Sequence, residues 1–153
     1  MYKNRYIRIL FIMIALVFIS GFRLNNNKIP NISKMKIEEK IGQMLMVRVR
    51  GDFYNSENAY FKDLKKNIKE YGIGGLITFG GSVHGTFYNI KGLQQDTKIP
   101  LLVGADYERG IGSWLNGATL FPTNMAIAAT NNDNYAYEQG TITAKEAKAI
   151  GVH

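Results

Sequence analysis

Hydrophobic side chains along this sequence follow two patterns, one with the period of a helix and one of short unbroken runs. The helical period predicts helices at residues 37–46, 58–71 and 87–97, and a last helix that is capped within 131–133 and extends to Ile150. Short apolar runs that include β-branched residues predict buried strands at residues 75–79 and 101–105, and a further short strand at 44–49 that follows the first helix.

Helices and strands therefore alternate, and only short segments connect them, with loops predicted at residues 80–85 and 106–117. This alternation indicates an α/β fold with a parallel sheet, and the apolar strands fit burial on both faces. Gly72 and Gly151 stand where glycine ends a helix. Residues 151–153 then reach the point where another strand should start, so we expect the sheet to continue beyond this chain.

The N-terminal residues differ in character from the rest. Residues 1–8 are basic, and residues 9–22 form an unbroken apolar run that Arg23 follows. A basic start and a short apolar run are typical of a secretory signal, and the run is shorter than the roughly 20 residues of a spanning helix. We therefore expect residues 1–23 to be a cleaved signal peptide or an N-terminal membrane anchor, and residues 24–35, which are polar, to be a linker.

Charge is distributed in a way that excludes one class of partner. The net charge is +7, but seven of the 19 Lys and Arg residues precede Ile37, and the remaining ones equal the 12 Asp and Glu residues in number. The folded part, from residue 36 onward, is thus nearly neutral and offers no basic surface for a phosphate backbone. We expect no nucleic-acid partner, and membrane contact only through the N-terminal segment.

The absence of cysteine and the presence of only two histidines limit the chemistry of the chain. They leave no disulfide, thiolate or cysteine-ligated zinc, and two histidines are too few for a histidine-rich metal site. The glycine-rich segments do not match the G-x-G-x-x-G pattern of a dinucleotide site.

The most distinctive polar segment is Asp106-Tyr107-Glu108-Arg109-Gly110, directly after a predicted strand. Ligands bind at the carboxyl ends of parallel strands, which makes an acid there a candidate for function as well as for turn formation. Asp106 and Glu108 do not suit the roles of the two catalytic carboxylates of a glycosidase. They would reach a sugar from the same side, whereas the two groups must act from different sides.

Two further side chains are weaker candidates. His84 follows a strand and can touch a ligand there, although a solvated loop histidine is the plainer interpretation. Ser82 and His84 make no triad without a placed acid. Trp114 can stack on a sugar ring or belong to the core, and the sequence does not separate these alternatives.

Five segments, taken in order, resemble the N-terminal domain of glycoside hydrolase family 3. They are I-E-E-K-I-G-Q-M-L-M at 37–46, Y-G-I-G-G-L-I-T-F at 71–79, I-P-L-L-V-G-A-D at 99–106 with Glu108, F-P-T-N-M-A at 121–126 with Ala129-Thr130, and A-x-E-A-x-A-x-G-V at 144–152. The resemblance covers residues 36–153 and implies that they are the N-terminal part of a (β/α)₈ barrel, with about three of the eight strands.

The resemblance also implies a function, the hydrolysis of terminal β-linked sugars with retention through a covalent glycosyl-enzyme, without metal or organic cofactor. It assigns sugar binding to Asp106, with Glu108 and Arg109 beside it. It places the nucleophile and the acid/base beyond residue 153, so we expect no catalytic residue in this chain and no activity from it alone. The partner would be a carbohydrate, a β-linked glycoside.

One departure concerns the identity of the sugar. The hexosaminidase branch has D-x-E-G-G-R after this strand, whereas this chain has Asp106-Tyr107-Glu108-Arg109-Gly110-Ile111. The segments at 37–46 and 121–126 favour β-N-acetylhexosaminidase, and β-glucosidase is the alternative within the family. A non-catalytic sugar-binding protein or an anchored structural protein is the alternative outside it.

We predict that residues 9–22 direct export, to the periplasm or the extracellular space, because a basic start precedes an uncharged run of signal length. Fractionation of cells that express a tagged full-length chain would test this. Tagged protein found wholly in the soluble cytoplasm, with Met1 or Tyr2 still at its N-terminus, would contradict it.

Overall fold

The structure is a computed structural model that describes residues 30–95 and 97–153. The signal or anchor predicted at residues 9–22, and most of the linker predicted at 24–35, lie outside the described residues. Among the helices that are described, none combines the length and the apolar character needed to cross a membrane.

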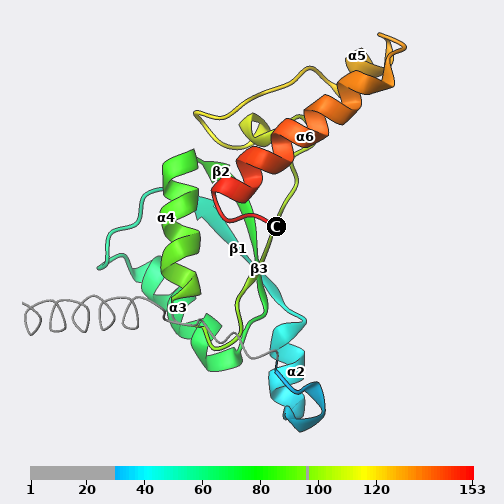
Figure 1. Ribbon diagram of the computed structural model, residues 1–153. Coiled ribbons are helices and arrows are strands. Elements are labelled where there is room, and N and C mark those ends of the chain that lie inside the picture. Colours follow the sequence, from blue (N-terminus) through cyan, green and yellow to red (C-terminus); the bar gives the residue numbers. More distant parts are fainter. Residues whose placement is uncertain (1–29, 96) are drawn as a thin grey trace, which may run out of the picture.

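Three parallel strands form the sheet, in the order β1 (Met46–Gly51), β2 (Gly75–Gly81) and β3 (Leu102–Ala105) (Figure 1). Helix α3 (Ala59–Tyr71) connects β1 to β2, and helix α4 (Val83–Gln94) connects β2 to β3. The remaining elements are short or lie outside these connections: η1 (Ile32–Lys34), α2 (Ile37–Gln43), η2 (Ile111–Ser113), α5 (Asn124–Ala128) and α6 (Asp133–Ala149). The predicted α/β class and parallel sheet are confirmed.

Helices α3, α4 and α6 begin at polar side chains that accept a hydrogen bond from the first turn. Asn58 accepts from the Phe61 amide, Ser82 from the Gly85 amide and Asn132 from the Asn134 amide. Such caps satisfy amides that have no partner within the helix. Gly72 ends α3 in the left-handed region, at φ 62°, as the sequence predicted.

One face of the sheet, which we call the covered face, carries the core. Val49, Leu76 and Val103 point into it from the three strands and are at most 1% exposed. Alternate residues of a strand point to opposite faces, so these three lie together across the register of the sheet. Buried side chains of α3, α4 and α6 pack against them: Leu64, Ile68, Ile90, Leu93, Ala147 and Ile150.

The opposite face of the sheet, the open face, is not buried. Met46 and Leu102 are 46% and 60% exposed, and Arg48 and Arg50 are exposed as well. Burial of the strands on both faces, which their apolar composition predicted, is therefore wrong for the described part of the chain. The reason is that α3, α4 and the C-terminal end of α6 pack against the other face.

Residues 152–153 lie beside β3, where the C-terminus is marked in Figure 1. The His153 amide donates to the Val103 carbonyl over 3.0 Å, and the Val103 amide donates to Nδ1 of His153 over 3.0 Å. Val152 is buried in the core. The end of the chain is thus hydrogen-bonded to the edge of β3.

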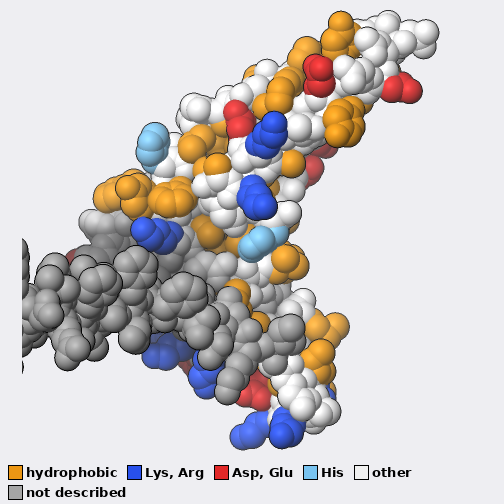
Figure 2. All heavy atoms as spheres, in the orientation of Figure 1, with side chains coloured by type: hydrophobic (Ala, Val, Ile, Leu, Met, Phe, Trp, Pro, Cys, Tyr) orange, Lys and Arg blue, Asp and Glu red, His pale blue; other side chains and the backbone are white. Residues whose placement is uncertain are grey.

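Helices α5 and α6 extend away from the sheet (Figure 1). Of the residues of α6, only Ala147 near its end is buried. Hydrophobic side chains line this projecting part in the space-filling view (Figure 2), and the exposed ones include Met125, Tyr135, Tyr137 and Ile142. The projecting part therefore contributes little to the core of the sheet.

The predicted loop at residues 80–85 is wrong. Strand β2 continues to Gly81, Ser82 caps the next helix, and α4 begins at Val83, four residues before the predicted start. The glycines of this segment, which suggested a loop, are used for close packing. A Cβ atom on Gly85 would overlap the Gly51 carbonyl oxygen.

Two helical glycines allow a matched test of this packing. We expect Gly85→Ala to destabilise the fold by at least about 2 kcal/mol, because its methyl group has no space against β1. Gly140→Ala in α6 should instead stabilise by about 0.5–1 kcal/mol, since nothing lies within 4 Å of the added Cβ. Urea unfolding of both variants measures this, and equal effects of the two substitutions would contradict the packing described.

Candidate functional site

The carboxyl ends of β1 and β2 are held together by backbone contacts. The Ser82 amide donates to the Gly51 carbonyl over 2.9 Å. Gly81, at φ 101°, adopts a conformation that favours glycine, and a Cβ atom there would overlap the Gly51 backbone. The two strands therefore end at one place in the structure.

Residues 106–123, which we call the β3 loop, cross over to this place. The Asn116 amide donates to the Gly81 carbonyl over 2.9 Å, and the Val83 amide donates to the Asn116 carbonyl over 3.3 Å. The ends of all three strands and the start of α4 thus form one edge. In open or closed parallel sheets this edge is where ligands bind.

A buried asparagine fixes the segment after β1. Asn89 of α4 is 4% exposed, and its amide nitrogen donates to the carbonyl oxygens of Arg50 and Asp52, each over 2.9 Å. A buried side-chain amide with two backbone acceptors holds its segment in one conformation. Apart from its position in a predicted helix, nothing in the sequence distinguished Asn89 from its neighbours.

Asp106, the main candidate from the sequence, directly follows β3 at this edge. Its side chain is exposed and makes no hydrogen bond or ion pair within residues 30–95 and 97–153. Its neighbour Tyr107 packs toward the covered face, where its hydroxyl lies 3.4 Å from Thr78 Oγ1, and burial raises the pKa of Tyr107. The carboxylate of Asp106 is therefore accessible to a ligand at the edge of the sheet.

The β3 loop is held from α6 by two polar side chains. Glu146 accepts hydrogen bonds from Thr119 Oγ1 over 2.6 Å and from the Thr119 amide over 3.3 Å. Gln139 donates to the Glu108 carbonyl over 3.1 Å. The sequence analysis missed both roles, since nothing in the sequence pairs α6 with this loop.

Hydrogen bonds within the β3 loop also shape it. The Phe121 amide donates to the Arg109 carbonyl over 2.9 Å, and the Gly112 amide donates to the Thr119 carbonyl over 2.8 Å. The backbone of Arg109 is therefore fixed. The side chain of Glu108, the other candidate beside Asp106, is exposed.

Trp114 does not belong to the buried core, which was one of the two alternatives left open by the sequence. Its ring packs edge-on against Phe79 with the centroids 5.2 Å apart, yet 43% of the residue is exposed. Phe79 follows the buried Thr78 on β2 and so points toward the open face, where the guanidinium of Arg48 lies 5.4 Å from its ring centroid. One aromatic surface on this face therefore joins β1, β2 and the β3 loop.

His84 lies in the first turn of α4 and not in a loop, and its side chain is exposed. No described hydrogen bond or ion pair links His84 to Asp106, Glu108 or Trp114. Among the described residues, no three or more His, Asp or Glu side chains are grouped so that they could hold a metal ion.

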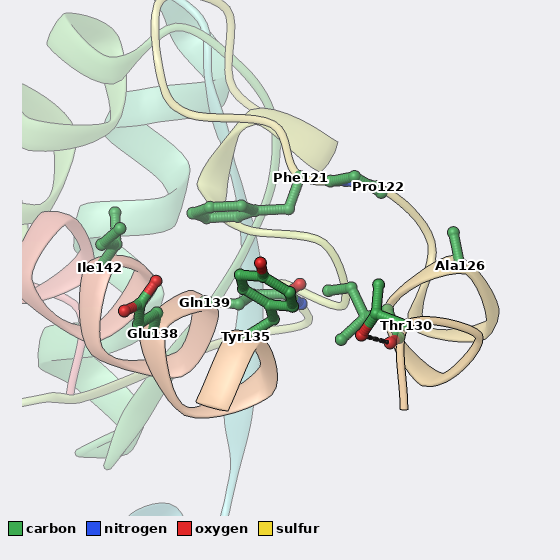
Figure 3. Close-up of a pocket in the computed structure, with 9 residues that line it drawn as sticks. Phe121, Pro122, Ala126, Thr130, Tyr135, Glu138, Gln139 and Ile142 are labelled. Carbon is green, nitrogen blue, oxygen red and sulfur yellow. Dashed lines mark hydrogen bonds between the residues drawn. The ribbon is translucent and has the colours of Figure 1, made fainter. Parts of the chain in front are cut away.

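An apolar pocket of about 310 Å³ lies behind the β3 loop, between α6 and residues 121–130 (Figure 3). Phe121 and Pro122 line one side, and Tyr135 and Ile142 of α6 line the other. Gln139 belongs to the wall of the pocket and also binds the Glu108 carbonyl. The pocket thus adjoins the loop that carries the candidate residues.

Residues 36–153 match the sequence model of the glycosyl hydrolase family 3 N terminal domain. A β-N-acetylglucosaminidase/β-glucosidase of Cellulomonas fimi is 26% identical over 122 residues, which are 80% of this chain and 20% of that protein. A lysosomal β-glucosidase of Dictyostelium discoideum is 30% identical over 139 residues, with 79% of this chain and 17% of that protein covered.

Two solved structures of the β-glucoside phosphorylase BglX are similar in fold. The one bound to 2FGlc has a TM-score of 0.66 and 25% identity, and the match covers 79% of this chain and 21% of that one. The other has a TM-score of 0.62 and 23% identity, with 80% and 20% covered. The chain spans about a fifth of the length of the relatives it matches.

We predict that Glu146→Ala loosens the β3 loop, because it removes both hydrogen bonds to Thr119. Hydrogen exchange followed by mass spectrometry should show faster exchange of the amides in residues 106–123. Glu138→Ala is the matched control, because Glu138 lies on the same helix and, among the residues that the structure describes, is hydrogen-bonded only to the nearby Asn134. Unchanged protection of the loop in Glu146→Ala would show that α6 does not hold it.

Proposed function

The chain belongs to glycosyl hydrolase family 3 through the N terminal domain of that family, and from this premise we propose that it serves in the hydrolysis of terminal β-linked sugars. The observation that carries the proposal is the accessible carboxylate of Asp106 at the carboxyl end of a parallel sheet. The named activities of the Cellulomonas and Dictyostelium relatives support a β-glycoside as the substrate class.

In this proposal Asp106 binds the substrate and does not react with it. An ionised carboxylate accepts hydrogen bonds from sugar hydroxyls, and charged acceptors make bonds roughly twice as strong as neutral ones. The sugar ring flattens toward an oxocarbenium-like geometry in the transition state, which moves its hydroxyls. Hydrogen bonds that fit this geometry better than the ground state lower the barrier to reaction.

Trp114 and the β3 loop complete the proposed binding surface. The exposed part of the indole offers an aromatic face to the apolar side of a sugar ring, and the Phe79 ring packs against the indole. Glu108 and Arg109 follow Asp106 in the ordered loop and are proposed to contact further hydroxyls. His84 is exposed in the first turn of α4, after the end of β2, and is the weakest of these candidates.

We propose that the nucleophile and the acid/base of a retaining mechanism come from outside residues 36–153. The exposed apolar side chains of the open face support a (β/α)₈ barrel in which further strands cover this face. In this proposal no metal or organic cofactor takes part, no nucleic acid binds, and residues 9–22 direct export or anchor the protein.

The sugar we favour is an N-acetylhexosamine, with glucose as the alternative. Both activities stand in the name of the Cellulomonas relative. Initial rates of the complete barrel protein on nitrophenyl β-N-acetylglucosaminide and nitrophenyl β-glucoside separate the two. A higher kcat/KM on the glucoside would overturn the choice of sugar and leave the family assignment intact.

We predict that Asp106→Asn, made in the complete barrel protein, lowers kcat/KM. The expected loss of transition-state stabilisation is about 1.5–3 kcal/mol, the range for a hydrogen bond to a charged group. Asparagine keeps the size and the turn-forming ability of the residue but removes its charge. Asp63→Asn, at an exposed position of α3, is the control and should leave kcat/KM unchanged. Near-normal kcat/KM in folded Asp106→Asn would mean that Asp106 only shapes the turn.

We also predict that residues 36–153 alone do not hydrolyse nitrophenyl β-glycosides, because retaining hydrolysis needs a nucleophile and an acid/base. The assay compares the purified segment with buffer and with the complete barrel protein. If turnover remains after further purification of the segment, catalytic groups lie within residues 36–153. This result would overturn the proposal that the nucleophile and the acid/base come from outside these residues.

A further inference from the structure

Asp106 is held in place by its neighbours and not by its own side chain. Its carboxylate makes no hydrogen bond or ion pair within the described part of the chain. Before it, Ala105 pairs with Thr78 of β2 in the register of the sheet. After it, the Tyr107 carbonyl accepts from the Gly110 amide over 3.3 Å, where the β3 loop turns. The direction of the Asp106 side chain therefore depends on how residues 105 and 107 are fixed.

Tyr107 is anchored on the covered face of the sheet. Its ring packs against the hydrophobic core there, as Ala105 does two residues earlier. Its hydroxyl lies 3.4 Å from Oγ1 of Thr78, a residue that is 1% exposed. Among the described residues, this tyrosine is the hydrogen-bond partner of the buried Thr78 hydroxyl. A buried hydroxyl that loses its partner destabilises the fold, so the pair also holds Tyr107 against β2.

The anchoring of Tyr107 directs Asp106 to the other side of the sheet. Successive side chains of an extended chain point to opposite faces, and Ala105 and Tyr107 both face the core. Asp106, between them, therefore points toward the open face, on which Phe79 and Trp114 pack together. A change of backbone direction that released Tyr107 from the core would carry the Asp106 carboxylate away from this surface.

These contacts do not depend on an unpaired edge of the sheet. Strand β2 lies between β1 and β3, and Thr78 pairs with Val49 on one side and Ala105 on the other. The Tyr107 ring lies on the face that α3, α4 and α6 already cover. Further strands of a barrel would cover the open face and leave the contacts of Tyr107 in place.

We propose that Tyr107 is a positioning residue, whose ring, anchored on the covered face, holds the Asp106 carboxylate in the direction that sugar binding requires. This inference rests on the proposed function of Asp106. The packed ring supplies most of the anchoring, because the hydroxyl contact with Thr78 is long for a hydrogen bond between two hydroxyl groups. Another aromatic ring of the same size can therefore replace the tyrosine, whereas a methyl group cannot.

Steady-state kinetics of the complete barrel protein, on the nitrophenyl β-glycoside that it hydrolyses faster, test this role. Misplacement of a contact that acts in the transition state lowers kcat more than it raises KM. We expect Tyr107→Ala to lower kcat at least about tenfold, with a smaller change in KM, and Tyr107→Phe to keep kcat within about twofold of the wild type.

Val103→Ala is the matched control. Val103 is buried on the same face of the same strand, but its neighbours in sequence are Leu102 and Gly104 and not Asp106. The variant also removes packing from the core of the covered face, so it should lower the stability of the fold. Its kcat should remain that of the wild type.

A double-mutant cycle with Asp106→Asn separates positioning from a general loss of packing. If Tyr107 acts through Asp106, Tyr107→Ala has little left to disturb once the carboxylate is gone. We expect its loss in kcat/KM to fall to about twofold or less in the Asp106→Asn protein. Val103→Ala should have the same effect in both proteins.

Circular dichroism establishes that each variant is folded. If Tyr107→Ala is not, Tyr107→Leu takes its place in the cycle, because leucine keeps an apolar side chain on the covered face but not the ring. An equal loss with and without Asp106, an unchanged kcat, or a loss in Tyr107→Phe as large as in Tyr107→Ala would each overturn the role of Tyr107 and leave the proposed function intact. Near-normal kcat/KM in Asp106→Asn would overturn the proposed function of Asp106, and the role of Tyr107 with it.

Discussion

The structure depends on the contact that the Gly51 backbone makes with Gly81 and Gly85. A side chain at Gly81 or Gly85 would overlap the Gly51 backbone, so only glycine lets β1, β2 and the first turn of α4 come this close. The contact brings the carboxyl ends of two strands to one place and sets the position of α4 over the covered face. Asn89 then reaches the carbonyl oxygens of Arg50 and Asp52 from that helix.

The position of Asp106 follows from this arrangement. Because β1 and β2 end together, the β3 loop can cross to Gly81 through Asn116, and Glu146 of α6 holds its far part at Thr119. The loop therefore leaves β3 in a fixed direction, and Asp106 stands at its start with an accessible carboxylate. Arg48, Phe79 and Trp114 line the neighbouring open face, so polar and aromatic groups lie around one edge of the sheet.

Periodicity and glycine positions predicted the strands, the parallel sheet and the helix end at Gly72, because local geometry decides these features. They misjudged residues 80–85, where the same glycines serve close packing in β2 and α4. The exposure of the open face and the hydrogen bonds of Glu146 and Asn89 depend on segments distant in sequence, and hydrophobic spacing holds no information about such pairs. The place of Asp106 at the end of a strand was predictable, because the apolar run that forms β3 leads directly into it.

The central claim is that Asp106, placed by this edge of the sheet, binds the hydroxyl groups of a sugar. A crystal structure of the complete barrel protein with a bound, non-hydrolysable β-glycoside tests it most directly. The account predicts the carboxylate of Asp106 within about 2.5–3.0 Å of two hydroxyl oxygens of one sugar ring. A sugar bound away from this carboxylate, with Asp106 contacting only the backbone of the β3 loop, would contradict it.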